Sequence, residues 1–309
     1  MRLTCSFLVI LLAGNLSAQV AFNDYFTNKS LRIDYYLSGD ASQTVVSLAQ
    51  LKKEPYWAGN YENLVDPINY GKYKILVYDK ESNKLIYTKG FCTLFQEWQT
   101  TAEAISEESG TDIPGEMIYK KTALNSSYYT FDVARYLTTT DIKSVYDYAA
   151  NVPYDQVYVL INSERYGGGG IYNHYSASTS DHELTPKVLV HEFGHGFAGL
   201  ANEYYSSAVA YEDFYPSDIE PWEPNITTLV DFDSKWKDMI NKKTPVPTPP
   251  DVEYAKTVGV FEGGGYMAKG VYRPYIDCRM NTNEASGFCP VCQRAISRMI
   301  EYYTKKSKE

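Results

Sequence analysis

The first third of the chain has a strand-like pattern of hydrophobic and polar positions. Residues 31 to 91 contain runs rich in β-branched and aromatic residues with polar punctuation: LRIDYYL, TVVSLAQL and YKILVYDKESNKLIYTKGF. The polar DKESNK within the last run indicates a hairpin turn. This pattern predicts a small all-β, sandwich-like unit. The polar, turn-prone segment EWQTTAEAISEESGTDIPGE makes a natural boundary, so we expect a β-rich domain at residues 19–104 and a second domain at residues 105–309.

From about residue 128 the pattern becomes mixed. TTTDIKSVYDYAANV predicts a helix, DQVYVLIN a nearly continuous apolar strand of the kind found inside mixed sheets, and CQRAISRMIEYY a closing helix. Between them, RYGGGGIYNHYSAST carries four glycines and then an alternating stretch. LTPKVLVHEFGHGFAGL predicts a helix that Thr185 can cap, that suits Pro186 in its first turn, and that Gly199 can end.

The beginning of the chain, MRLTCSFLVILLAGNLSAQ, has the arrangement of a secretory signal peptide. One arginine precedes an apolar run of roughly ten residues, and small residues come before Gln19, so we expect cleavage after Ala18. A buried N-terminal helix is the alternative. The run is too short to span a membrane, and no second run approaches that length. We therefore expect a secreted, periplasmic or cell-surface protein without membrane insertion.

The composition limits the classes of binding partner that the protein can have. The formal net charge of −9 argues against nucleic acid as a partner. The chain has 30 tyrosines, which combine apolar area with one polar tip and suit exposed sheets and binding grooves.

The central predicted helix carries a candidate metal site. His191 and His195 lie one helical turn apart and face the same way, so both rings can reach one ion. Glu192 is displaced around the helix, where its carboxylate can hold a water and accept its proton. This is the HExxH pattern of zinc peptidases, and it predicts one zinc ion with Glu192 as general base. Two buried structural histidines are the alternative interpretation.

Counting the histidines limits which residue can be the third metal ligand. The chain has four, and none follows residue 195, so a downstream third histidine is impossible. In a metzincin pattern, the ligand follows the glycine that ends the helix by three residues, which here is Asn202. Glu203 comes next, and its carboxylate is the stronger zinc ligand. The sequence leaves either residue as the third ligand.

Four cysteines remain once Cys5 leaves with the signal peptide. Cys278, Cys289 and Cys292 lie close together, and a CxxC pair plus one upstream cysteine can bind structural zinc, but no fourth ligand stands nearby in the sequence. Because export permits disulfides, we favour a disulfide from Cys278 to either Cys289 or Cys292.

Several separated motifs resemble the M64 peptidases, the IgA peptidase family of secreted bacterial zinc endopeptidases. They are HEFGHGFAGLANEYY, YGGGGIYN, YRPYIDCRMN, FCPVC and EPWEPNITTLVDFDSKW, and the β-rich start with EWQTTAEA is similar to the family's N-terminal domain. The resemblance covers most of the chain that follows the signal peptide.

The resemblance implies an α+β fold with a metzincin-like catalytic domain. In such a domain a twisted mixed sheet lies over the active-site helix, and a methionine turn lies beneath the metal. Met280 matches that methionine and would pack under the histidines without binding the ion. The glycine-rich run would lead into the edge strand above the cleft, where an extended peptide can pair with the backbone. The expected substrate-binding residues are Gly168, Gly169, Gly170 and Ile171.

Two departures from the family pattern concern the site and the length. The family shows Asp-Glu-Tyr after the helix glycine, whereas this chain has Asn202, Glu203 and Tyr204. Family members also carry a further block between the motifs matching EWQTTAEA and ESGTDIPGE, which nearly abut here. The chain therefore resembles a shortened member.

Two functions follow from these patterns. The first is a secreted zinc endopeptidase that cuts extended segments of proteins or glycoproteins, such as immunoglobulin A or mucins. The second is a catalytically impaired relative that keeps the groove and binds proteins or glycoproteins. Tyr266 and Tyr272 are candidates for stabilising an oxyanion, although packing is the favoured role of each.

Overall fold

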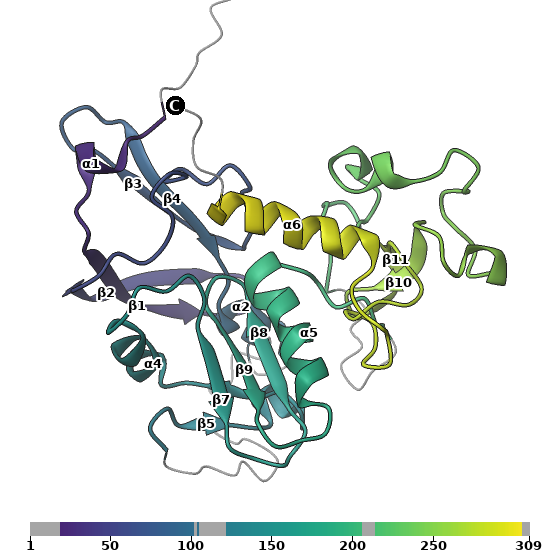
Figure 1. The fold of residues 1–309 in the computed structure, drawn as a ribbon, viewed down its shortest axis with the longest axis horizontal. Coiled ribbons are helices and arrows are strands. Elements are labelled where there is room, and N and C mark those ends of the chain that lie inside the picture. Colours follow the sequence, from purple (N-terminus) through teal and green to yellow (C-terminus); the bar gives the residue numbers. More distant parts are fainter. Residues whose placement is uncertain (1–18, 102–103, 105–121, 206–213, 305–309) are drawn as a thin grey trace, which may run out of the picture.

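The computed structural model describes residues 19–101, 104, 122–205 and 214–304. The chain folds as a mixed α+β protein with small sheets (Figure 1). Its helices in chain order are α1 (Phe22–Tyr25), α2 (Leu94–Trp98), α4 (Ile142–Ala149), α5 (Thr185–Ala198) and α6 (Pro290–Thr304). Its strands are β1 (Ser30–Gly39), β2 (Thr44–Glu54), β3 (Tyr73–Tyr78), β4 (Leu85–Phe91), β5 (Ser126–Ser127), β6 (Thr138–Thr139), β7 (Tyr158–Ile161), β8 (Gly168–Ile171), β9 (Tyr175–Thr179), β10 (Phe261–Gly264) and β11 (Met267–Arg273). Single 3₁₀ turns lie at Thr130–Asp132, Phe232–Ser234, Lys237–Met239 and Val252–Tyr254.

The N-terminal part consists of two separate antiparallel hairpins, β1–β2 and β3–β4. The hairpin turn predicted at DKESNK is confirmed, because the Asp79 and Asn83 amides close it and Asn83 takes a left-handed conformation. The expected sandwich-like packing is not seen at β1–β2. Most side chains of these two strands are partly or fully exposed, and only Glu54 is buried. The local core is instead built by Val20, Phe22, Trp57, Leu64 and Ile86.

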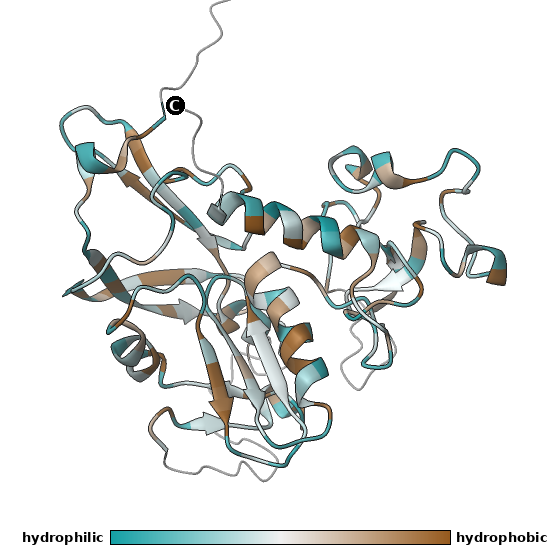
Figure 2. Cartoon of the chain, in the orientation of Figure 1, coloured by the Kyte–Doolittle hydropathy of each residue, from teal (hydrophilic) through white to brown (hydrophobic). Residues whose placement is uncertain are grey.

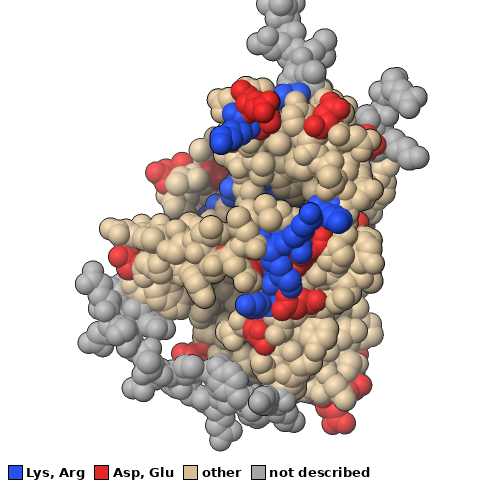
Figure 3. Space-filling view, turned by 90° about the vertical axis from the view of Figure 1, so that its left-hand side faces the viewer, with Lys and Arg blue, Asp and Glu red and all other residues tan. Residues whose placement is uncertain are grey.

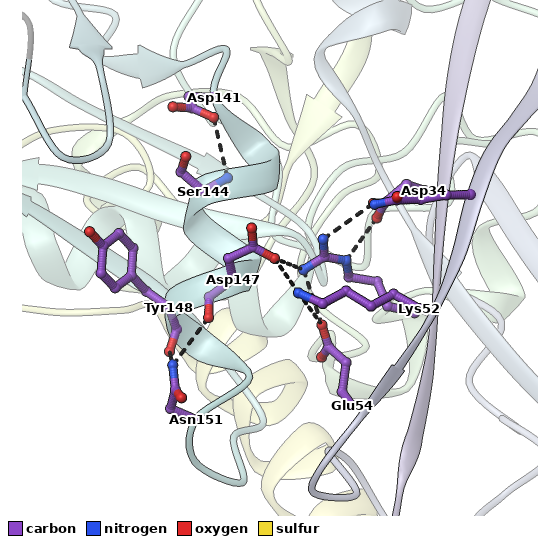
Figure 4. Close-up of polar contacts among 10 residues, drawn as sticks. Asp34, Lys52, Glu54, Asp141, Ser144, Asp147, Tyr148 and Asn151 are labelled. Atoms are coloured by element: carbon purple, nitrogen blue, oxygen red, sulfur yellow. Dashed lines mark hydrogen bonds and ion pairs between the residues drawn. The ribbon is translucent and has the colours of Figure 1, made fainter.

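The β1–β2 hairpin is attached to the rest of the molecule by charges (Figure 4). Arg32 donates to Asp147 of α4 at 2.8 Å, and Lys52 reaches the same carboxylate. Arg32 also lies 3.0 Å from buried Glu54. On the face drawn in Figure 3, Lys and Arg side chains adjoin Asp and Glu side chains, so the charges there compensate each other.

The central sheet has the strand order β7–β9–β8, with β7 parallel and β8 antiparallel to β9. Its small, mostly buried positions receive α5, which packs on both β8 and β9. β7 and parts of α5 are among the hydrophobic segments in Figure 2. The apolar strand and the mixed sheet predicted from the sequence are thus observed.

The N-cap of helix α5 lies one residue earlier than the sequence predicted. Leu184 is the N-cap and offers no side-chain hydrogen bond, whereas Thr185 is already the first helical residue. Gly199 ends the helix as expected, at a φ of 62°, and its amide returns to the carbonyl of His195. A Cβ there would lie 2.6 Å from the Trp222 ring, so both conformation and space require glycine.

Helix α6 closes the molecule against α5 (Figure 1). Its buried positions join Phe197, Trp236 and Met280 in the largest core cluster. At its far end, the Tyr302 hydroxyl donates to the Asn63 carbonyl at 3.0 Å, which ties the helix to the N-terminal part. Among the described residues, no helix has the length and apolar composition needed to cross a membrane.

Candidate active site

Three side chains converge beside the C-terminal half of α5. The Nε2 atoms of His191 and His195 are 3.0 Å apart, and Asn202 Oδ1 lies 3.0 Å from the first and 3.2 Å from the second. In a tetrahedral zinc site with ligands at about 2.1 Å, neighbouring ligand atoms are about 3.4 Å apart. The triangle of donor atoms therefore has the size of one face of such a site.

Hydrogen bonds orient both imidazoles toward the centre of this triangle. His191 Nδ1 donates to the Arg279 carbonyl at 2.8 Å, and His195 Nδ1 donates to the Leu200 carbonyl at 2.5 Å. A carbonyl only accepts, so each Nδ1 carries the proton and each Nε2 presents a lone pair. Burial lowers the pKa of His191, and burial together with His191 lowers the pKa of His195 to about 3. Both rings are thus held neutral, the form that binds metals.

Asn202 supplies a third lone pair rather than a donor. Its Nδ2 donates to the hydroxyl of Tyr266, which turns Oδ1 toward the two imidazoles. Three acceptor atoms therefore face one another within 3.2 Å without a proton between them. Such an arrangement fits a cation, because mutually facing lone pairs repel unless a positive charge separates them.

Glu203 does not join this group. Its side chain is fully buried and points the other way, with Oε1 accepting from Asn225 Nδ2 at 2.9 Å. The Glu203 amide donates to the Met280 carbonyl at 2.8 Å. Of the two residues between which the sequence could not decide, the structure brings Asn202 to the histidines and takes Glu203 away from them.

Glu192 is buried between α5 and the glycine strand β8. A Cβ on Gly168 would lie 2.6 Å from Glu192 Oε1, and a Cβ on Gly170 would lie 3.0 Å from Oε2. Strand β8 therefore approaches the carboxylate so closely that only glycine fits at these two positions. Burial raises the pKa of Glu192 to about 8, against an opposing effect of Arg135. A carboxyl group with such a pKa can both accept and release a proton near neutral pH.

The predicted glycine run forms a strand, but part of its outer edge is already paired. The Gly168 amide donates to the Arg135 carbonyl, and the Gly168 carbonyl accepts from Leu137, each at 3.1 Å. Within the described part of the chain, Gly170 forms no backbone hydrogen bond to a segment outside its sheet. Gly170 is thus the position on this strand nearest to an open edge, whereas the Ile171 carbonyl already accepts from the His174 amide at 3.0 Å.

Met280 lies beneath α5 and is completely buried. Its sulfur would be 2.7 Å from a Cβ on Gly194, so the helix rests directly on this side chain. The preceding residue, Arg279, provides the carbonyl that orients His191. The turn at 278–280 thereby supports the candidate site without contributing a side-chain donor to the triangle.

A cavity of about 600 Å³ opens over these residues. Sequence reasoning missed part of its wall, namely Arg135, Tyr136 and Glu97. Tyr136 donates to Glu97 at 2.8 Å, and the Arg135 guanidinium lies over the Tyr204 ring at 5.9 Å. No local sequence pattern marks these residues, because they reach the cavity from segments that precede the motif by more than one element.

The expected disulfide is not formed. Cys278, Cys289 and Cys292 are all free, and the Sγ atoms of Cys278 and Cys292 are 3.7 Å apart. A disulfide needs about 2.05 Å between its sulfurs. The three thiols instead converge on the buried carboxylate of Glu203. This fourth residue comes from the segment after α5, outside the local spacing pattern of the cysteines.

Comparison with known families gives the class of the protein. Residues 83–254 and 250–300 match the family IgA Peptidase M64, and residues 21–110 match the Peptidase M64 N-terminus. The chain therefore belongs to the M64 peptidase family. The two matched regions overlap at residues 83–110, where the predicted shortening lies; residues 105–121 are outside the described structure. No curated protein matches the chain.

Proposed function

We propose that this chain is a secreted zinc endopeptidase whose metal is held by His191, His195 and Asn202. The observation that carries the proposal is the triangle of three lone-pair atoms within 3.2 Å, each oriented by a hydrogen bond on its far side. The family consists of peptidases, which supports the reaction class. The packing of Met280 beneath α5 supports a metzincin-like arrangement with this turn under the metal.

A zinc ion at this position would polarise the scissile carbonyl and lower the pKa of the attacking water. Glu192 would accept a proton from the attacking water and deliver it to the leaving amine, because its raised pKa lies close to neutral pH. Tyr266 fixes the amide of Asn202. The open edge at Gly170 would pair with the backbone of an extended substrate, and Arg135 and Tyr136 form part of the cavity wall.

We further propose that the substrate is an exposed, extended segment of a protein or glycoprotein, with immunoglobulin A or mucins as candidates. The family description supports immunoglobulin A. Export through residues 1–18 would bring the enzyme to such a substrate. N-terminal sequencing of the protein from culture medium and cell fractions tests the export, and a mature chain that begins at Gln19 is expected.

Metal analysis tests the active site. The variants His191→Ala and His195→Ala should each lose one zinc ion per chain relative to the wild type and lose peptide hydrolysis. His182→Ala is a matched control, because this histidine lies before α5 and its ring accepts from the Leu184 amide instead of facing the triangle. Unchanged metal content in both test variants would remove the proposed site.

Hydrolysis itself separates the peptidase from a binding module. The wild-type chain should cleave extended peptides, and a zinc chelator should abolish the cleavage. Binding of glycoproteins without cleavage, by a chain that holds its full metal content, would favour the catalytically impaired alternative. That alternative derives from the neutral Asn202, which replaces the acidic residue implied by the family pattern.

A further inference from the structure

A second group of potential metal ligands lies on the other side of the Met280 turn. Glu203, Cys278, Cys289 and Cys292 place their ligand atoms within 4.8 Å of one another. All four side chains are buried, with at most 3 % of any residue exposed. They come from three segments: the residues after α5, the turn after β11, and the beginning of α6. The group is therefore created by tertiary packing and is closed to solvent.

The distances have the size of a tetrahedral site. Sulfur ligands at about 2.3 Å from zinc are about 3.8 Å apart in a tetrahedron, and a sulfur and a carboxylate oxygen are about 3.5 Å apart. The sulfurs of Cys278 and Cys292 are separated by 3.7 Å, and Cys292 Sγ lies 3.1 Å from Glu203 Oε1. Three thiolates and one carboxylate leave no open position, which is typical of structural rather than catalytic zinc.

The carboxylate of Glu203 lacks sufficient partners for a buried acid. Asn225 and Cys292 bond to Oε1, whereas Oε2 has no hydrogen-bond partner among the described residues. Arg273 does not supply the missing partner through Nη1, because this atom donates to the carbonyls of Glu262 and Gly263. A buried, under-bonded carboxylate is costly unless a cation compensates it.

The thiols show signs of the same preference for a cation. The Cys289 amide donates to Cys278 Sγ at 3.3 Å, an interaction that stabilises a thiolate. A divalent ion suits such a buried group of sulfurs, because it takes the place of the thiol protons when it binds.

We propose that Glu203, Cys278, Cys289 and Cys292 bind a second zinc ion with a structural role. The ion would join the segment after α5 to the Met280 turn and to the start of α6. Because Asn202 adjoins Glu203, and Arg279 and Met280 adjoin Cys278, the same ion would fix the third ligand of the proposed active site, the carbonyl that orients His191, and the side chain beneath the helix.

The decisive experiment uses the full chain with the four ligands intact. In the double variant His191→Ala/His195→Ala, metal analysis should find one zinc ion per chain. Zinc X-ray absorption should show mainly sulfur neighbours at about 2.3 Å. A zinc-free double variant that is folded by circular dichroism, or a remaining ion with only nitrogen and oxygen neighbours, would overturn the proposal. The readout does not require activity, so it stands apart from the test of the active site.

Cysteine chemistry provides an independent measurement on the wild-type chain. After chelation and denaturation, alkylation without reductant should label Cys92 and all three cluster cysteines, because none of these residues is in a disulfide. Before denaturation and chelation, the cluster thiols should be protected. An intramolecular disulfide found by mass spectrometry in the metal-loaded protein would overturn the proposal.

Ligand variants then assign the ion to the four residues. Cys289→Ser and Cys292→Ser should each lose one zinc ion per chain and the sulfur neighbours in the X-ray absorption spectrum. Cys92→Ser should keep that ion and those sulfur neighbours. Cys92 is the matched control, because it is a partly buried free cysteine outside the cluster. Retention of the sulfur-bound ion in both cluster variants would contradict the assignment, and the double histidine variant decides the question if these variants do not fold.

Discussion

Asn202 and Glu203 are consecutive residues whose side chains face two different groups of potential ligands. Asn202 Oδ1 lies 3.0 Å from His191 Nε2, whereas Glu203 Oε1 lies 3.1 Å from Cys292 Sγ. The two side chains reach different partners, so one short stretch of chain can serve both groups. Substitutions at the two positions should therefore have separable effects on metal binding.

The first prediction concerns the neutral ligand. Asn202→Asp should tighten zinc at the histidine site by about tenfold or more, because an anionic oxygen binds zinc more strongly than an amide, and even the hydrogen-bond partners of ligands alter affinity by about 10- to 100-fold. Peptide hydrolysis should rise with occupancy. Chelator competition and initial rates measure both quantities. Asn202→Ala should weaken the same ion, and equal affinity in all three proteins would exclude Asn202 as a ligand.

The second prediction concerns the general base. Glu192→Gln should lower kcat by about 10²- to 10⁴-fold, because the amide keeps the shape of the side chain but cannot accept a proton at neutral pH. Metal content should stay at the wild-type value. Glu183→Gln is the control, since that glutamate is exposed just before α5. A loss of less than about tenfold would remove Glu192 from this role.

The third prediction concerns the glycine strand. Gly168→Ala and Gly170→Ala should each destabilise the protein by about 1–3 kcal/mol, as overpacking typically does, and should displace the Glu192 carboxylate. The new Cβ atoms would meet Glu192 atoms at 2.6 Å. Thermal unfolding and kcat measure the two effects. Gly287→Ala is the control, because a Cβ there meets nothing within 4 Å; equal stability of all variants would show that β8 lies farther from α5 than described.

The fourth prediction concerns pH. Burial raises the pKa of Glu97 from 4.5 to about 7, so the folded chain binds this proton more tightly than the unfolded chain does. The contribution to stability is therefore complete below pH 4.5 and is lost as the pH rises toward 7. Glu97→Gln should flatten the pH dependence of the free energy of unfolding across this interval.

Denaturant titrations from pH 4 to pH 8 measure the effect on stability. Tyr136→Phe is a useful companion, because it removes the hydroxyl that donates to Glu97 without removing the carboxyl. An unchanged slope between wild type and Glu97→Gln would mean that Glu97 titrates at its ordinary value in the folded chain.

The sequence by itself determined the parts of this protein that depend on short-range periodicity. His191 and His195 share a helical face because residues four apart always do, and Gly199 ends the helix because its left-handed conformation is easiest for glycine. The apolar strand, the hairpin turn and the closing helix follow from equally local patterns. Spacing after Gly199 pointed to Asn202, but the better ligand chemistry of a carboxylate left Glu203 as the alternative.

Only the tertiary structure decided which distant groups meet. Glu203 joins Cys278, Cys289 and Cys292 because α5, the Met280 turn and α6 pack together, and no spacing rule spans those segments. In the same packing the cysteines are free thiols and Arg135 lies in the cavity wall. The glycine strand lies directly against the Glu192 carboxylate. Local propensity acts over a few residues, whereas burial and close approach are properties of the whole folded chain. They place the carboxylate of Glu203 among cysteine sulfurs instead of beside the histidines.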